Sequence, residues 1–257
     1  IGLQYELTPY LNWNAENVLA VFLDNSQKNY RWYPGSGIYR GVKLIATDPL
    51  HVALWGTAVS TPRVSPKEAE IQLAIEVENQ YDDQRKLTLA TAIVDPDGKA
   101  VAQAESNHKL NGSSKQNFTQ SLKVKQPALW SARNPAMYKA VTKIVSNGAV
   151  VDTYATPFGI RKIEWNAENG MLVNGKPVLM RGVNIHHDLG CLGAAFYADA
   201  MKRRLEVLRD VGYNAIRTSH NPHAPELLDM CDRMGFYVVA EAFDKWGGRL
   251  YPTFEED

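Results

Sequence analysis

Hydrophobic and polar residues alternate in the middle of the chain with the period of two that is typical of half-buried β-strands. The clearest run covers 70–78, where acidic or amide residues fall mainly on one face and aliphatic residues on the other. A similar run at 87–93 is followed by Asp95-Pro-Asp-Gly-Lys99, which predicts a turn because Pro fixes φ and Gly accepts positive φ. About seven short strands over roughly 110 residues predict a β-sandwich without the disulfide of antibody domains. The remaining strands are expected around 99–105, 117–124, 137–146 and 149–158.

From about Lys162 the pattern changes to alternating strands and helices. A helix is predicted at 199–211, where Met201, Leu205 and Leu208 recur at helical spacing. Short strand–helix steps imply parallel strands with right-handed crossovers. The pattern fits the start of a doubly wound sheet or of a (β/α)8 barrel and does not choose between them. The other predicted elements are strands at 178–184, 214–218 and 236–243 and a helix at 225–234 ended by Gly235.

The first 48 residues are aromatic and strand-like. Residues 17–24 form a near-continuous apolar run, and 36–45 supply a second predicted strand after the turn Tyr33-Pro-Gly-Ser36. We interpret this segment as the tail of an all-β domain, too small to bury a core by itself.

Composition and charge narrow the classes of function. Hydrophobic residues make up 45% and charged residues 22%, an ordinary globular balance. Lys plus Arg and Asp plus Glu both number 28, so no net charge favours nucleic acid or an anionic membrane, and neutral substrates fit better. No apolar run approaches the roughly 20 residues of a membrane span. The chain begins at Ile1 and not at Met, which suits a trimmed signal peptide. The compartment is not legible from the sequence; a bacterial periplasmic or secreted location is favoured over a cytoplasmic one.

Polar side chains cluster at the predicted carboxyl ends of the three parallel strands. Because functional groups of parallel α/β folds gather at these ends, we expect a shared ligand site there. The competing interpretation is that these groups are structural, with Arg217 tying carboxylates together. The clusters are Asn184, His186, His187 and Asp188; then Arg217, Ser219, His220, Asn221 and His223; then Glu241, Asp244 and Trp246.

Other chemistries have little support. Catalytic zinc held by the histidines and Glu241 is disfavoured, because His186 and His187 are neighbours in a strand and no HExxH is present. Cys191 and Cys231 form no CxxC pair, which argues against a zinc site or a disulfide scaffold. Ser219 lacks the GxSxG setting of a nucleophile. With no P-loop and no GxGxxG, no cofactor is expected.

Four stretches of the chain stand out as motifs. The longest is Asn214-Ala-Ile-Arg-Thr-Ser-His-Asn-Pro222, followed by Leu227-Leu228, Asp232, Gly235 and Phe236-Tyr-Val-Val239. The other three are Arg31-Trp-Tyr-Pro-Gly-Ser-Gly-Ile-Tyr-Arg40, Leu172-Val-Asn-Gly-Lys-Pro177 and Met180-Arg-Gly-Val-Asn-Ile-His-His-Asp188. In this order and at this spacing the four stretches resemble glycoside hydrolase family 2, which contains β-galactosidases, β-glucuronidases and β-mannosidases, and the longest resembles the family signature.

The resemblance implies a multi-domain β then α/β architecture, and it favours the barrel over the doubly wound sheet. Residues 1–48 would be the end of a jelly-roll sugar-binding domain and 49–160 an immunoglobulin-like β-sandwich. Residues 161–257 would be the first part of a (β/α)8 TIM barrel with its first three strands. The implied activity is retaining hydrolysis of terminal β-glycosides, β-galactosides above all, by two glutamates about 5–5.5 Å apart.

In the family those glutamates follow the fourth and seventh barrel strands, both beyond Asp257, so we expect no turnover from this chain alone. Glu241 follows the third strand, matches neither position and is not expected to be the acid/base. Arg217 matches an arginine that holds the nucleophile, and His220 a histidine that contacts the sugar. His186 and Asp188 match positions that reach the glycone hydroxyls.

Two departures from the family pattern affect the site. Asn221 stands where a Tyr is common, which is expected to alter the shape of a subsite. Lys245 and Gly247 stand where some β-galactosidases bind Mg²⁺ and cannot ligate it, so the segment 243–246 resembles the metal-free branch. The expected partner is a carbohydrate, with a homo-oligomer possible. The alternatives are a β-glucuronidase or β-mannosidase and, from another class, a non-catalytic carbohydrate-binding protein.

Overall fold

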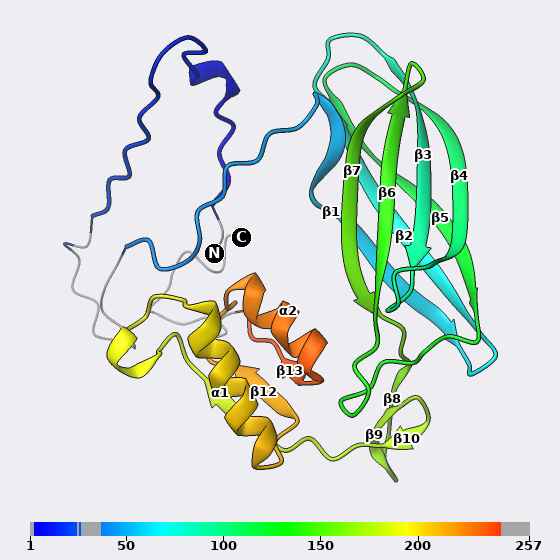
Figure 1. Cartoon of the computed structure of the whole chain (residues 1–257), viewed down its shortest axis with the longest axis vertical. Coiled ribbons are helices and arrows are strands. Elements are labelled where there is room, and N and C mark those ends of the chain that lie inside the picture. Colours follow the sequence, from blue (N-terminus) through cyan, green and yellow to red (C-terminus); the bar gives the residue numbers. More distant parts are fainter. Residues whose placement is uncertain (1–2, 25, 27–36, 243–257) are drawn as a thin grey trace.

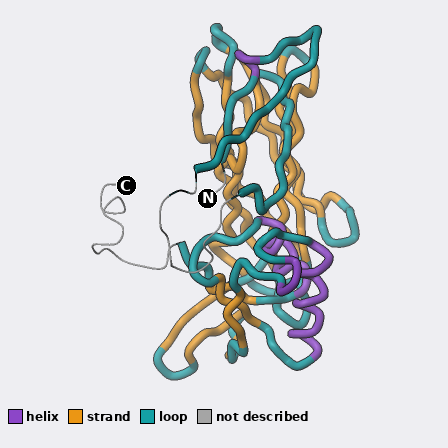
Figure 2. Tube along the Cα trace, turned by 90° about the vertical axis from the view of Figure 1, so that its left-hand side faces the viewer, coloured by secondary structure: helices purple, strands orange, loops and turns teal. Residues whose placement is uncertain are grey.

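A computed structural model describes residues 3–24, 26 and 37–242 of the chain. An elongated β-sandwich occupies one side of the molecule, and a smaller α/β unit lies at one end of it (Figure 1). The strands of the sandwich run along its long axis, and the helices lie beside its lower end (Figure 2). No helix in the described ranges is long and apolar enough to cross a membrane.

Two antiparallel sheets form the sandwich, with strand orders β1-β2-β5 and β4-β3-β6-β7. The alternation over 70–78 is confirmed, because Ile71, Leu73, Ile75 and Val77 of β2 are all fully buried. Each such side chain contributes about 1.5–3 kcal/mol through removal from water. The predicted sandwich is therefore observed. Its strands are β1 (Leu50–Val64), β2 (Glu68–Asn79), β3 (Arg85–Val94), β4 (Ala100–Leu110), β5 (Ser114–Lys125), β6 (Met137–Ser146) and β7 (Ala149–Gly159).

The predicted turn between β3 and β4 is confirmed. The Gly98 N–H donates to the Asp95 carbonyl at 3.0 Å, and Gly98 has φ +85°. β4 runs to Leu110, further than the expected end at 105, and β5 begins earlier than expected at Ser114. The polar residues 106–109 remain in β4 because the strand stays paired with β3 as far as Leu110, which faces Arg85.

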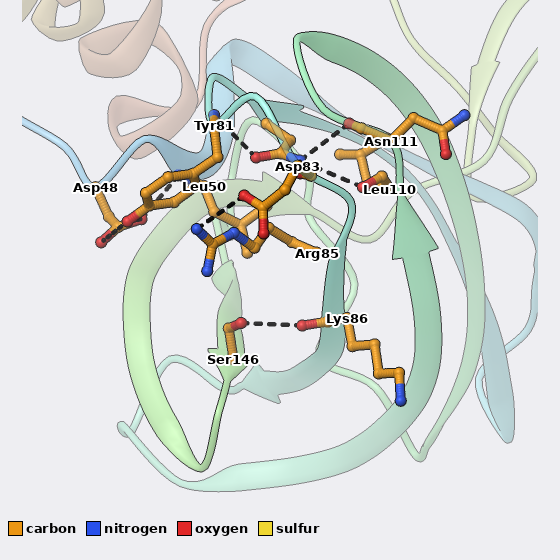
Figure 3. A network of polar contacts seen from close by, with 10 residues as sticks. Asp48, Leu50, Tyr81, Asp83, Arg85, Lys86, Leu110, Asn111 and Ser146 are labelled. Carbon is orange, nitrogen blue, oxygen red and sulfur yellow. Dashed lines mark hydrogen bonds and ion pairs between the residues drawn. The ribbon is translucent and has the colours of Figure 1, made fainter.

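Buried polar groups close one end of the sandwich. The side-chain amide of Asn79, which is fully buried, donates to the carbonyls of Asp83, Leu110 and Asn111 at 2.9–3.3 Å. The carbonyls of Asp83, Leu110 and Asn111 belong to the β2–β3 turn, to the last residue of β4 and to the residue after it (Figure 3). The Asn79 amide therefore joins both sheets. Asp48 acts at the same end, since its carboxylate accepts the Leu50 N–H at 2.8 Å. The entry point of the chain into the sandwich is thereby fixed.

The α/β unit contains a parallel sheet of order β11-β12-β13, formed by Gly182–Ile185, Ala215–Thr218 and Tyr237–Val239. Helices α1 (Ala198–Asp210) and α2 (Pro225–Met234) connect these strands, so the two predicted helices and the parallel pairing are confirmed. The core between helices and sheet includes Ile185, Met201, Leu205, Ile216, Leu227 and Phe236.

The first predicted strand of this unit starts later than expected. Residues 178–181 are not part of it, because the Val178 N–H donates to Met171 in a small antiparallel sheet region and the Arg181 N–H donates to the Asn214 side chain. That small sheet, order β10-β9-β8, was not predicted, although the Asn174-Gly175 dipeptide between β9 and β10 is a strong hairpin signal. Its strands are β8 (Ile163–Asn166), β9 (Gly170–Val173) and β10 (Lys176–Pro177).

The strands predicted near the N-terminus are wrong for the described residues. Within 3–24 and 37–48 the structure contains only the 3-10 helix η1 (Thr8–Tyr10) and no strand. The apolar run at 17–24 has no neighbouring strand to pair with, and Phe22 is 92% exposed. A strand needs a partner for its backbone groups, so an apolar sequence alone does not produce one. The jelly-roll assignment of 1–48 stays a prediction, and the turn at 33–36 and Phe243 lie outside the described residues.

Trp130, in the connection between β5 and β6, joins the sandwich to the α/β unit. Its side chain is 1% exposed, and its indole N–H donates to the Asp232 carbonyl of α2 at 2.8 Å. The Arg161 guanidinium covers one ring face at 4.5 Å, and Tyr237 of β13 meets the ring edge-on. Close by, a Cβ on Gly235 would come within 2.2 Å of the Ala132 carbonyl oxygen, so the end of α2 fits this connection only as glycine.

Candidate functional site

Three charged or titratable side chains meet at the carboxyl edge of the parallel sheet. Arg217 lies on β12, His220 follows β12 in the loop to α2, and Glu241 comes two residues after the end of β13. The Glu241 backbone N–H donates to the Thr218 hydroxyl at 2.9 Å, which ties the two strand ends together. The fold thus brings groups from separate strands to one place, as expected for parallel strands.

Glu241 contacts both of its neighbours. One carboxylate oxygen accepts an N–H from the Arg217 guanidinium, and the other lies 2.9 Å from His220 Nδ1. The Glu241 side chain is 18% exposed, so water competes little for these contacts. Arg217 also reaches the Asn184 amide oxygen of β11 at 3.5 Å, and its side chain is 40% exposed. The guanidinium is therefore oriented from two sides while part of it stays accessible.

The two adjacent histidines after β11 point to different partners. The His186 ring packs edge-on against His220, with ring centroids 5.2 Å apart. His187 instead stacks on His223 at 4.0 Å and makes a short hydrogen bond with the Asn221 side chain. His186 therefore belongs to the group around Glu241, whereas Asn221 belongs to a second group that includes His187 and His223.

Asp188 lies beside these groups, but its hydrogen bonds go to other residues. It is exposed, and one carboxylate oxygen accepts the Gly190 N–H at 2.8 Å at the start of the 3-10 helix η2 (Gly190–Leu192). Its backbone carbonyl accepts an N–H from Arg204 of α1 at 2.6 Å. In this structure Asp188 holds the loop after β11, and its second carboxylate oxygen is not used in these contacts.

Tyr39 and Arg40 of the N-terminal segment contact the loops that hold the stacked rings of His187 and His223. Tyr39 meets the His187 ring edge-on at 5.6 Å, and Arg40 donates to the Pro222 carbonyl. Burial lowers the pKa of His223 from its ordinary 6.5 to about 4, helped by the nearby His187 and Arg40 charges. Burial also lowers the pKa of His187, against the opposing effect of the hydrogen bond that its ring donates to the Asn221 amide oxygen. Both rings are therefore neutral near pH 7.

Acidification is expected to destabilise the protein through His223. Below pH 6.5 the unfolded chain protonates this imidazole, whereas the folded chain does so only near pH 4. Since the unfolded state binds more protons in this window, the free energy of unfolding should fall by about 2 kcal/mol between pH 7 and pH 5. His223→Phe keeps a flat ring but cannot titrate, so urea unfolding of this variant should show a shallower pH dependence. An identical dependence in both proteins would contradict the assignment.

The geometry bears on the alternative chemistries. Among the described residues, no three His, Cys, Asp or Glu side chains are placed to hold a metal ion. The Ser219 hydroxyl is buried and has no hydrogen-bond partner within the described part of the chain, where a nucleophilic serine would contact a base. Asp244, Lys245, Trp246 and Gly247 lie outside the described residues.

Two cavities of different size lie near the described strand ends and at the junction of the two parts of the molecule. A cavity of about 10 Å³ lies between His186, His187, Asp188 and His223. The larger cavity, about 380 Å³, lies at the junction of sandwich and α/β unit, and its lining includes Trp130, Arg161 and Asp232. The larger cavity does not include the strand-end groups. We therefore place the candidate site by its side chains and not by cavity volume.

Comparison with known proteins matches nearly the whole chain. Residues 53–161 match the model of glycosyl hydrolases family 2, and residues 166–247 match the model of the TIM barrel domain of the same family. A β-galactosidase of Bacteroides ovatus, BoGH2A, is 48% identical over 247 residues, which is 96% of this chain. A putative β-glucuronidase of Formosa agariphila is 34% identical over 96% of this chain.

Solved structures agree with the sequence comparison. The crystal structure of a glycosyl hydrolase family 2 member from Bacteroides cellulosilyticus covers 86% of this chain with a TM-score of 0.80 and 40% identity. The chain spans 31% of the length of that structure, 29% of BoGH2A and 23% of the Formosa protein. Similarity therefore extends over almost all of this chain but under a third of each relative.

Proposed function

Because the chain belongs to family 2 of the glycosyl hydrolases, we propose that the protein containing it hydrolyses terminal β-glycosidic bonds, with β-galactosides as the preferred substrates. The reaction proceeds with retention through a pair of glutamates outside this chain, one acting as acid/base and the other as nucleophile. The partner molecule is a neutral carbohydrate, in keeping with equal numbers of acidic and basic residues.

The observation that supports β-galactosides is the identity of 48% with a β-galactosidase, against 34% with a putative β-glucuronidase, over the same share of the chain. The polar cluster at the carboxyl edge of the parallel sheet supports a site in that place. Barrel enzymes build their active sites at this edge from residues of several strands. The proposed domains are 1–48, 49–160 and 161–257, as assigned from the sequence.

In this proposal the residues of this chain bind and orient, and they do not transfer the proton. Arg217 contacts Glu241 and Asn184 with part of its guanidinium. It holds the nucleophile carboxylate through its remaining N–H groups. His220 contacts the sugar, and His186 supports it through the ring contact.

Two further residues shape the sugar subsites. Asp188 binds a glycone hydroxyl through the carboxylate oxygen that Gly190 does not occupy. Asn221 stands where a larger Tyr is common in the family and is held by its hydrogen bond with His187. The subsite beside Asn221 is therefore wider than one lined by Tyr.

The test is hydrolysis of matched chromogenic β-galactoside, β-glucuronide and β-mannoside by the full-length protein. We expect the galactoside to give the highest kcat/KM, and NMR of the first product to show retained anomeric configuration. A higher kcat/KM for the glucuronide would reassign the glycone. Binding of galactose with no turnover of any substrate would instead indicate a carbohydrate-binding protein.

This chain alone serves as the negative control, because both glutamates of the reaction are assigned outside it. We expect no turnover from the purified chain. Measurable hydrolysis that is lost in Glu241→Gln would overturn that assignment and make Glu241 a catalytic carboxylate.

A further inference from the structure

Glu241 receives contacts that no role in the proposed reaction yet explains. Its two carboxylate oxygens go to different partners, one to the Arg217 guanidinium and one to His220 Nδ1 at 2.9 Å. Its backbone is fixed separately by the Thr218 hydroxyl. A side chain that is held at its own backbone and shared between two neighbours can set the geometry of both.

The contact between Glu241 and His220 determines whether the second ring nitrogen, Nε2, acts as a hydrogen-bond donor or acceptor. A carboxylate only accepts hydrogen bonds, so His220 must carry its proton on Nδ1 to bond with Glu241. In the neutral ring Nε2 is then an acceptor, and in the imidazolium it is a donor. The carboxylate also sets the orientation of the ring, as carboxylates do for the histidines of catalytic triads and metal sites. His186, packed edge-on, limits rotation from another side.

The contact with Arg217 acts on the second partner. Glu241 approaches the guanidinium from the segment just after β13, and Asn184 approaches it from β11. The planar group is therefore held from both sides of β12. A planar guanidinium held in this way presents its remaining N–H groups in a fixed direction. The angle at which Arg217 can meet another carboxylate therefore depends on Glu241.

The same contacts argue against proton transfer by Glu241. A general acid in glycoside hydrolysis must hold a proton and direct it to the leaving oxygen. Both Glu241 oxygens instead accept hydrogen bonds from groups of this chain, and only 18% of the side chain is exposed. Its geometry suits an acceptor that orients other residues.

We infer that Glu241 is a positioning residue that orients Arg217 and His220 together, so that one carboxylate aligns two functional groups of the site. This inference rests on the proposed glycosidase function. It assigns to the end of the third strand a task distinct from those of the two glutamates that carry the reaction.

The test is a double-mutant cycle in the full-length protein. Glu241→Gln places an amide N–H₂ against one of two donors, so kcat/KM should fall about 10-fold or more, as for loss of the partner that orients a functional histidine. In a His220→Ala background the same change should cost clearly less, because one of its two targets is already gone. Equal losses in both backgrounds, or full activity of Glu241→Gln, would overturn the inference.

Two further variants test whether the effect of Glu241→Gln is specific to the position and geometry of this carboxylate. Glu241→Asp keeps the charge but withdraws it by one methylene, so it should lose activity to a similar degree; wild-type activity in this variant would count against the inference. Glu206→Gln removes a carboxylate of α1 that pairs with Lys202 at 3.8 Å, away from the site, and should leave kcat/KM unchanged. A loss in Glu206→Gln as large as that in Glu241→Gln would show a general effect of removing charge and refute a specific one.

A crystal structure of the Glu241→Gln protein separates this inference from the proposed function. We expect the His220 ring to rotate and the Arg217 guanidinium to shift. If both side chains keep their positions, Glu241 does not position them, whatever the substrate. If the wild-type protein hydrolyses no β-glycoside but the side chains move, the orienting role holds and the proposed function fails.

Discussion

Replacing Arg217 with Ala in the full-length protein is expected to lower kcat about 100-fold or more while the fold survives. A nucleophilic glutamate must be ionised while a second one nearby keeps its proton, and a fixed guanidinium favours the charged form of the first. Arg217 is held by Glu241 and Asn184 with 40% of its side chain exposed, so it can serve this purpose. The measurement is kcat on a chromogenic β-galactoside together with the melting temperature of the same preparation.

Two controls sharpen the Arg217 prediction. Arg217→Lys should rescue poorly, because one ammonium cannot reproduce a planar two-point contact. Arg203→Ala removes an exposed arginine from α1 and should leave kcat near normal. If Arg217 only stabilises the packing of strands β11 to β13, Arg217→Ala will lower the melting temperature sharply. The fraction of the enzyme that stays folded will then keep a near-normal kcat.

Replacing Trp130 with Ala is expected to reduce the free energy of unfolding by about 3–5 kcal/mol, as for other buried large-to-small changes. The indole packs with Met171, Ala215 and Tyr237, and its N–H bond to the Asp232 carbonyl would be lost as well. The residues that contact the indole belong to the α/β unit and to the small sheet. The lost stabilisation should therefore weaken the packing between these parts and the sandwich. Urea unfolding followed by circular dichroism measures the change.

Trp165 is the matched control for Trp130. It lies on β8, close to the junction in sequence, but it is 65% exposed. Trp165→Ala should therefore change the free energy of unfolding by less than about 1 kcal/mol. Equal losses in the two variants would show that Trp130 does not join the two parts.

The sequence was sufficient to predict the helices and strands for which hydrophobic spacing and turn residues indicate the same element. In β2 the alternating aliphatic residues are all buried, and α2 ends at Gly235 as expected. It was not sufficient for the strand at 17–24, because an apolar run reads as a strand whether or not a partner lies beside it. The hairpin at Asn174-Gly175 carried a usable signal, but its strands are only two to four residues long and hold little periodicity.

The site was predictable as a place but not as a set of contacts. Parallel strands put Arg217, His220 and Glu241 at one edge, which strand–helix alternation already indicates. Which oxygen meets which nitrogen depends on the register, in which Arg217 faces Val239, and register cannot be read from the sequence of one strand. His186 and His187 were expected to be neighbours in a strand, but both follow the end of β11, so strand alternation does not determine which way each ring points.

The position of Trp130 also has a consequence for biosynthesis. Its hydrogen-bond partner, Asp232, lies 102 residues further along the chain. A ribosome adding roughly 5–20 residues per second delivers that partner on the order of 5–20 seconds after the tryptophan. During this interval the strands of the sandwich can already pair, leaving an indole and its apolar surroundings uncovered on the nascent chain. That surface is a natural binding site for a chaperone until α2 emerges, and mutations that slow the folding of α2 would lengthen the exposure and promote aggregation.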